Sequence, residues 1–416
     1  MWPLGYHWKW VARNRFQLLG GLGVAIVLPG LLRSGLDISP VDSFGSQENT
    51  VIGTFLAMLF GAYLRKRMTV HPGTSSVSIV LPAFGAAYGL AVLAFFFLRV
   101  DYSRAQFGMS FVLVLIWFAL IARVEPHIRR HRLLVLPFGR AEDLLTNQAA
   151  DWIVARSPQA LPPRITGVAA DLHANLAPEW ERLLSRAALS GLPVYHWKQI
   201  DESLSGTVDI ERLANLGSLL PSSVYLRLKR LVDTAMVVVT LPLTLPIAVL
   251  AAVAILICDG RPILFRQTRT GFQGRQFVML KLRTMPVGSE HGQAFTEPDD
   301  PRVTRLGRIL RHYHIDELPQ IINILKGEMS WIGPRPESHA LAKWYEGEVP
   351  FYSYRHIVRP GITGWAQVHQ GNVAQIKAAT GKLRYDFYYI KYFSPWLDLA
   401  IVAKTVRIVL TGFGSR

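Results

Sequence analysis

Two adjacent carboxylates, Asp316 and Glu317, follow a strongly basic stretch of this 416-residue chain. Four arginines precede them at three-residue spacing: Arg302, Arg305, Arg308 and Arg311. Side chains three residues apart share a helix face, so this spacing predicts a basic stripe that leads to the acids. Such a stripe is often only a solvated charged face. Cations that converge on carboxylates, however, suit a site that holds phosphates and a divalent cation.

The acid pair has two candidate roles. One carboxylate could attack phosphorus as a nucleophile, as in aspartyl-phosphate enzymes, while the other binds the metal that neutralises the phosphates. Adjacent residues on a helix point about 100° apart, so the two can serve one site without duplicating a role. The alternative is a pair of negative charges that stabilises a helix N-terminus.

Two elements after the acids would help to position them. The apolar run 321–325 predicts a short helix. The turn that follows holds Arg335 between Pro334 and Pro336. Because proline fixes its own backbone dihedral, this turn is stiff and would aim the arginine in one direction.

A β-hairpin is predicted before the acids, over residues 265–285. Its glycine-rich turn lies near 271–274, and alternation of side chains marks the second strand. That strand carries Lys281 and Arg283, two further cations for a phosphate site.

The composition points to a membrane. The chain is 50% hydrophobic and only 18% charged, against roughly 25% charged residues in ordinary soluble domains. Its net charge of +16 fits nucleic acid, an anionic membrane surface or a phosphorylated substrate. The basic residues gather beside apolar runs and around the acids, which favours membrane and phosphate, so no nucleic-acid partner is predicted.

Four apolar runs, at roughly 16–32, 50–64, 77–98 and 107–124, fill the first third of the chain. Only the third comfortably reaches the roughly 20 residues that a crossing needs. Charged flanks on alternate sides nevertheless fit four crossings over residues 1–125, with both ends in the cytoplasm. These flanks are Lys9, Arg13 and Arg15 before the first run, Asp37, Asp42 and Glu48 after it, Arg65, Lys66 and Arg67 after the second, and Arg123, Arg129, Arg130 and Arg132 at the end of the fourth. The region is interpreted as an anchor or packing domain.

A fifth apolar run, 231–257, is long enough to cross but has basic residues on both flanks. Both of its ends are therefore expected in the cytoplasm. Pro242 and Pro246 lie in mid-run, where each removes a backbone donor, so the helix is predicted to break there. We interpret the run as a re-entrant helix-break-helix; the alternative is a fifth crossing with a proline kink.

Between the two membrane regions, residues 131–205 predict a small α/β domain. Short strand-like stretches at 132–139, 164–172 and 192–197 alternate with helix-like stretches at 141–156 and 177–190, which favours a parallel sheet. The glycine-rich dinucleotide fingerprint is absent, so no nicotinamide cofactor is predicted. The polar stretch 201–209 is interpreted as a linker.

Residues 224–412 resemble the bacterial sugar transferase family, the membrane-associated phosphoglycosyl transferases that act on polyprenol phosphate. The resemblance is carried by KRLVD at 229–233, KLRTM at 281–285, DPRVTRLGRILR at 300–311, DELPQIINILKGEMSWIGPRP at 316–336 and VRPGITGWAQVHQG at 358–371. Four crossings and a small soluble domain ahead of this core look like the large subgroup that starts polysaccharide or glycoconjugate repeat units, such as those of exopolysaccharide and O-antigen.

The resemblance implies a reaction. Asp316 matches the nucleophile, which attacks the sugar-bearing phosphate of a UDP-sugar and releases UMP. Polyprenol (undecaprenyl) phosphate then takes the phosphosugar from the enzyme. Glu317 matches the family's metal-associated acid, with Mg²⁺ as the cation, and Arg311 matches an arginine for the lipid phosphate. The other residues assigned to substrate binding are Lys281, Arg283, Arg335, Arg359 and Gln367.

Two departures from the family pattern concern local hydrogen bonding. The family's helix break often carries Ser-Pro, whereas this chain has Leu245 before Pro246. Residues just before the acids are commonly small or hydroxylated, and here they are Tyr313 and His314.

The predicted fold class is a membrane protein of three parts: an α-helical N-terminal bundle at 1–125, a small α/β soluble domain at 131–205, and a mixed α/β monotopic catalytic domain with a re-entrant helix at 224–416. The catalytic domain is expected on the cytoplasmic face of the bacterial inner membrane, against the lipid bilayer, with a possible homodimer. The alternative function is a membrane-tethered scaffold or binding protein that keeps the fold without catalysis. The sugar stays open.

Overall fold

The computed structural model describes residues 13–35, 44–69, 77, 79–128, 132–147, 150–159, 161–163, 165–209, 221, 223–289, 300–370 and 376–411. The chain divides into two compact units, an N-terminal unit, Met1–Gly206, and a C-terminal unit, Thr207–Arg416. Some flanking charges of the topology prediction lie outside the described residues: Lys9, Asp37, Asp42, Arg129 and Arg130.

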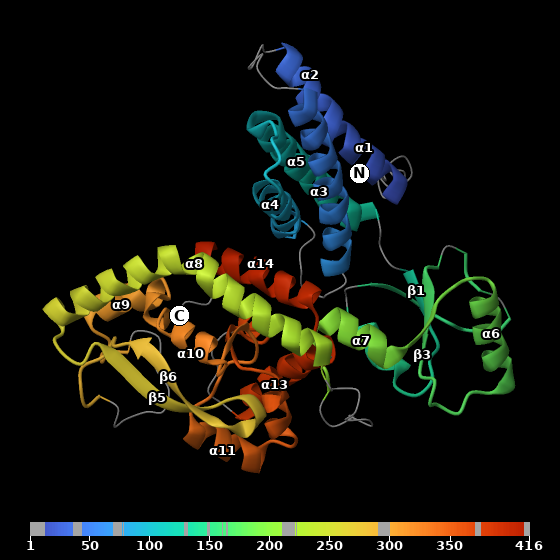
Figure 1. Ribbon diagram of the computed structural model, residues 1–416. Helices are drawn as coiled ribbons and strands as arrows, with labels where there is room; N and C mark the ends of the chain where they lie inside the picture. Colours follow the sequence, from blue (N-terminus) through green and yellow to red (C-terminus); the bar gives the residue numbers. More distant parts are fainter. Residues whose placement is uncertain are drawn as a thin grey trace. The chain divides into compact units, whose positions relative to one another are not determined.

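The first part of the N-terminal unit is helical (Figure 1). Its elements are α1 (Asn14–Leu22), the π-helical turn η1 (Gly23–Val27), α2 (Leu28–Gly35), α3 (Phe44–Met68), α4 (Val80–Leu98) and α5 (Arg104–Ile128). Small residues let these helices approach closely, because a Cβ at Gly61 would lie 2.3 Å from the Phe84 ring. Arg65 joins the ends of three helices, since it pairs with Glu125 at 3.0 Å and donates to Gln17 at 2.6 Å.

Length and composition mark four described helices as able to cross a membrane: Asn14–Leu32, Val80–Leu98, Arg104–Glu125 and Ser223–Cys258. The helix predicted around 50–64 is present as α3, which has 25 residues, but its charged ends keep it out of this set. Helix α3 still exposes apolar side chains along its length, including Ile52, Leu56 and Phe60. The helical character of the N-terminal region thus agrees with the prediction.

The rest of the N-terminal unit is a small α/β module. Its four strands, all parallel, are β1 (Arg132–Val135), β2 (Asp151–Val154), β3 (Gly167–Ala170) and β4 (Val194–His196), in the order β2-β1-β3-β4. Helices α6 (Pro178–Leu189) and α7 (Trp197–Ser205) and the 3₁₀ turn η2 (Ala141–Thr146) complete it.

Two expectations for this module are wrong. The stretch 141–156 is not one helix, because only the turn η2 is helical and β2 follows it. A short apolar run has no periodicity that separates strand from helix. Residues 151–154 form a strand because they pair with β1. The stretch 201–209 is not all linker, since residues 201–205 end α7.

The C-terminal unit contains the long helix α8 (Ser223–Cys258) and a mixed α/β body. The body holds the hairpin β5 (Leu264–Thr270) and β6 (Gln276–Leu282), then α9 (Arg305–His312), η6 (Ile315–Glu317), α10 (Gln320–Lys326), β7 (Ser330–Ile332), α11 (His339–Glu348), η7 (Tyr352–Ile357), β8 (Gly361–Thr363), α12 (Gln367–Gln370), α13 (Ile376–Lys391) and α14 (Pro395–Thr411). The predicted hairpin and the helix after the acids are both confirmed. Strands β7 and β8 pair in parallel.

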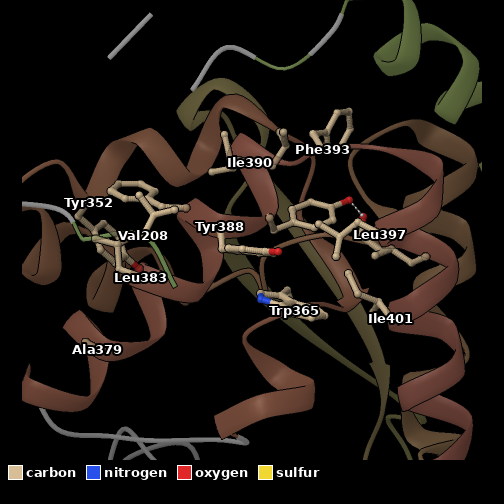
Figure 2. Packing of buried hydrophobic residues seen from close by; sticks show 14 of the residues in the cluster. Val208, Tyr352, Trp365, Ala379, Leu383, Tyr388, Ile390, Phe393, Leu397 and Ile401 are labelled. Carbon is tan, nitrogen blue, oxygen red and sulfur yellow. Dashed lines mark hydrogen bonds between the residues drawn. The ribbon is translucent and has the colours of Figure 1, made fainter. Parts of the chain in front are cut away.

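The core of this body forms where α13 and α14 pack on the β8–α12 segment. Leu383, Phe387 and Ile390 repeat at helical spacing along α13 and are buried. Figure 2 shows Leu397 and Ile401 of α14 on the other side of the same cluster, with Trp365 and Tyr388 between. This core fixes the loop after β7, which carries Arg335.

Helix α8 is continuous through Pro242 and Pro246, so the predicted helix break is wrong. Figure 1 shows α8 as a bent helix rather than two. The Thr240 hydroxyl donates to the Met236 carbonyl at 2.8 Å, and the Thr244 hydroxyl donates to the Thr240 carbonyl at 3.0 Å. Threonine hydroxyls that bond to the preceding turn, like prolines inside a helix, are associated with helix bending, and α8 bends without a break.

Both halves of α8 pack on the same body. In the first half, Lys229 pairs with Asp398 at 2.5 Å, and Asp233 accepts from the Ser330 hydroxyl at 3.0 Å. In the second half, Ile255 lies in an apolar cluster with Leu282 and Leu310, among others. The opposite face exposes a row of large apolar side chains: Leu231, Val239, Leu243, Leu250, Val253 and Ile257.

Candidate active site

The acid pair lies on a tight turn between two short helices. Helix α9 begins at Thr304, whose hydroxyl accepts from the Gly307 amide at 2.9 Å, as an N-cap does. After α9, His314 takes a left-handed conformation with φ of 54° and starts the 3₁₀ turn η6, which carries Asp316 and Glu317. Both acids are buried.

Glu317 is held by two cations from elements far apart in sequence. The Lys281 ammonium on β6 lies 2.7 Å from its carboxylate, and the Arg335 guanidinium after β7 lies 3.1 Å away. Burial alone would raise the pKa of Glu317, but these two cations outweigh it and hold the pKa well below its usual range. Glu317 is therefore an ionised carboxylate with fixed partners.

Asp316 has the opposite environment. Among the described residues, no hydrogen bond or ion pair reaches its carboxylate. Burial raises its pKa, and the field of Lys281 and Arg311 offsets part of that rise while Glu317 adds to it. Two neighbouring carboxyls in different environments are a common way for a site to assign them different roles. Of the two acids, Asp316 is the one whose carboxylate has no hydrogen bond to a described residue.

The positive charge of Arg311, the last arginine of the predicted stripe, acts to lower the pKa of Asp316. Its Nε donates to the Thr284 hydroxyl at 2.8 Å, which fixes the side chain near the end of β6. Burial lowers the pKa of the Arg311 guanidinium, and the Asp316 charge opposes that shift. Thr284 was not singled out from the sequence, although it lies in the KLRTM motif.

Three predicted substrate residues have other partners in this structure. Arg283 donates to the backbone carbonyls of Asp259 and Gly260 and so holds the end of α8. Arg359 donates to the Gly327 carbonyl at 3.0 Å. Gln367 donates to the Ile362 carbonyl at 2.9 Å. Their assignment to substrate binding stays a prediction.

The turn around Arg335 is held by close backbone packing. Gly333 has no room for a side chain, because a Cβ there would lie 2.2 Å from the Arg359 carbonyl. The Gly361 amide donates to the Pro334 carbonyl at 3.0 Å, which ties the turn to β8. Glycine and proline together thus aim Arg335 at Glu317.

The residues present fit a magnesium ion that arrives with a phosphorylated substrate. No group of three or more histidine, cysteine, aspartate or glutamate side chains within the described ranges could hold a metal by itself. Mg²⁺ is commonly bound by one or two carboxylates together with substrate phosphates. The ionised Glu317, with Asp316 beside it, offers that number of carboxylates.

The fold and the site together define a membrane protein with a buried acid pair set among cations. Residues 224–412 match the family described as bacterial sugar transferase. The chain is 42% identical over 99% of its length, and 99% of the other, to the UDP-N-acetylgalactosamine-undecaprenyl-phosphate N-acetylgalactosaminephosphotransferase of Aeromonas hydrophila. This chain belongs to the bacterial sugar transferase family and is a polyprenol-phosphate phosphoglycosyl transferase.

Other relatives match less than half of the chain. The UDP-glucose:undecaprenyl-phosphate glucose-1-phosphate transferase of Caulobacter vibrioides is 43% identical over 44% of this chain and 70% of its own length. The protein of the same name from Xanthomonas campestris pv. campestris is 40% identical over 44% of this chain and 38% of its own.

Proposed function

We propose that this protein transfers a sugar 1-phosphate from a UDP-sugar to undecaprenyl phosphate and releases UMP. The observation that carries the proposal is the pairing of a buried, unengaged Asp316 with a Glu317 that two cations keep ionised. Ion pairs that only stabilise a fold do not need a second buried acid without a partner, because burying an unpaired carboxyl is costly.

The proposed reaction proceeds in two displacements at phosphorus. An Asp316 oxygen forms a bond to the β-phosphorus of the UDP-sugar, and the bond from that phosphorus to the bridging oxygen breaks, so UMP leaves with the electron pair. A phosphate oxygen of undecaprenyl phosphate then attacks the aspartyl phosphosugar. The Asp316 carboxylate leaves, and undecaprenyl diphosphate sugar is formed. Splitting one displacement into two is what a covalent nucleophile provides.

The surrounding cations have separate tasks in this proposal. Glu317 and the substrate phosphates would hold Mg²⁺, which neutralises charge on the phosphates when bound. Lys281 and Arg335 each donate one hydrogen bond to Glu317, so their other N–H groups can bind the phosphates of the UDP-sugar. Arg311, on the Asp316 side, is assigned to the lipid phosphate. A planar guanidinium suits phosphate oxygens.

A UMP-release assay with a panel of UDP-sugars and undecaprenyl phosphate tests the function. UDP-N-acetylgalactosamine is the donor we expect to work, because the relative that matches over the full length is named for that sugar. UDP-glucose is the matched comparison, since it is the donor in the names of two relatives that match 44% of this chain. Release of UMP with none of the sugars would favour the non-catalytic scaffold instead.

We also propose that α8 is re-entrant and that the acid pair faces the cytoplasm. At 36 residues, a straight α8 would be roughly 54 Å long, well beyond the roughly 30 Å of a hydrocarbon core. Contacts near both ends of α8 with one compact body support a helix that enters and leaves on the same side. The basic flanks at 227–230 and 261–275 favour the cytoplasmic side.

Cysteine labelling is expected to place both ends of α8 inside. In a Cys258→Ser background, cysteines at Ser223 or Ser289 should not react with a membrane-impermeant thiol reagent in intact spheroplasts, and both should react after lysis. A cysteine at Asp101, in the exposed turn between α4 and α5, is the positive control and should react in intact spheroplasts. Reaction at the Ser289 position alone before lysis would show that α8 spans the membrane.

A further inference from the structure

Beneath the Arg335 turn lies a buried set of charges that the proposed reaction does not use. We call it the Arg355 network; it consists of Arg355, Glu337, Lys382 and Asp386. Arg355 lies 2.8 Å from Asp386 and 3.9 Å from Glu337, and Lys382 lies 2.6 Å from Glu337. The Arg355 side chain is 3% exposed and that of Asp386 is 2%.

The network is joined directly to the turn that carries Arg335. Arg355 donates to the Arg335 carbonyl at 3.0 Å. Arg269 donates to the next carbonyl, that of Pro336, at 2.9 Å, and the Thr270 amide donates to the Glu337 carbonyl at 3.2 Å. The backbone carbonyls of residues 335, 336 and 337 thus each accept a hydrogen bond. The side chain of Arg335 reaches from this fixed backbone to Glu317.

The energetic cost of such a network requires a reason. Burying four charges loses solvation that their attraction only partly returns, and apolar residues of similar size often give equal or better stability. Specific geometry is one thing that an apolar packing would not supply here, because only hydrogen-bond donors can hold the backbone carbonyls of the turn. The Tyr352 hydroxyl accepts from Arg355 at 2.7 Å and fixes its orientation further.

We propose that Arg355 is a positioning residue for the transferase. Glu337, Asp386 and Lys382 hold Arg355 in place, and Arg355 holds the Arg335 backbone. The Arg335 guanidinium therefore stays beside Glu317 and the phosphates of the UDP-sugar. The inference rests on the proposed function, because it takes the roles of Glu317 and Arg335 from there. Arg355 itself does not contact the acid pair; it acts through Arg335.

The proposal has a consequence for binding of the UDP-sugar. If Arg355 no longer holds the Arg335 carbonyl, the Arg335 guanidinium is no longer fixed beside Glu317 and the phosphates of the UDP-sugar. The loss should then appear mainly in the KM for the UDP-sugar rather than in kcat.

The test compares Arg355→Lys and Asp386→Asn with the control Lys229→Met in the full-length protein. Lys229→Met also breaks a buried ion pair of the same unit, with Asp398, but not one in the Arg355 network. We expect the two network variants to lower kcat/KM for the UDP-sugar by about 10- to 100-fold, as small misplacements of a binding group do. Most of this loss should appear as a higher KM for the UDP-sugar, and the KM of Lys229→Met should not change.

A double variant tests whether the activity losses at Arg355 and Arg335 are additive, as they would be if Arg355 only stabilised the fold. In an Arg335→Lys background, Arg355→Lys should cost little more, because coupled residues are not additive. If the network variants fold poorly, Tyr352→Phe removes one hydroxyl and should raise the KM for the UDP-sugar by less. An unchanged KM or fully additive losses would overturn the inference while wild-type activity stands. Absence of UMP release by the wild type would instead overturn the proposed function.

Discussion

Replacing Asp316 with asparagine should lower UMP release by about 1,000-fold or more, the scale seen when a covalent nucleophile is removed. An amide is a poor nucleophile at phosphorus, so neither the bond to the β-phosphorus nor the departure of UMP is assisted. Because the Asp316 carboxylate holds no hydrogen bond to a described residue, the change should leave the fold intact. The measurement is UMP release by the purified, membrane-bound variant.

A matched control separates this effect from a general loss of carboxylates. Glu328→Gln makes the same kind of change at the end of α10, where the side chain accepts from Asn323 at 2.6 Å, and a glutamine oxygen can still accept there. It should retain most of the activity. Wild-type protein incubated with labelled UDP-sugar, without the lipid, should also carry the label covalently, and Asp316→Asn should not. Retention of more than a few per cent of UMP release by Asp316→Asn would rule out its role as nucleophile.

Removal of divalent cations should stop the reaction, with a loss of about 100-fold or more, and added Mg²⁺ should restore it. Two phosphorylated substrates and a carboxylate nucleophile repel one another, and a bound cation is the largest charge available to offset that repulsion. The measurement is UMP release after treatment with EDTA and again after Mg²⁺ in excess of the chelator.

Glu317→Gln tests whether this acid holds the cation. The variant should need a higher Mg²⁺ concentration for half-maximal activity, since a neutral amide oxygen binds Mg²⁺ more weakly than a carboxylate does. It also leaves Lys281 and Arg335 without their partner, so unfolding temperatures of variant and wild type should be compared in the same experiment. Undiminished activity in excess EDTA would contradict both the metal and the role given to Glu317.

Much of the fold was predictable where the pattern is local. The apolar run after the acids and the glycine turn of the hairpin specify α10 and the β5–β6 pair through short-range periodicity and turn chemistry. The parallel sheet of the α/β module also agrees with its alternating pattern. Family motifs placed Lys281, Arg335 and the acid pair together, and the structure brings these four into contact or close electrostatic reach.

The errors have one physical origin. The short run 151–154 became a strand because β1 offered it hydrogen bonds. Helix α8 stays continuous through its prolines, and both of its halves pack on the same body. Both outcomes depend on partners that a local propensity does not include.

The sequence by itself therefore determined the membrane character, the acid pair and its cations, because residue type and short spacing carry that information. Only the tertiary structure decided which acid is paired with cations and which has no hydrogen bond to a described residue. That difference arises from Lys281 and Arg335, which lie 36 and 18 residues from Glu317. The Arg355 network also could not be read from the sequence, because Arg355 and Asp386 are 31 residues apart. The packing of α13 on η7 gives Arg355 its carboxylate partner, and the turn after β7 gives it the Arg335 carbonyl.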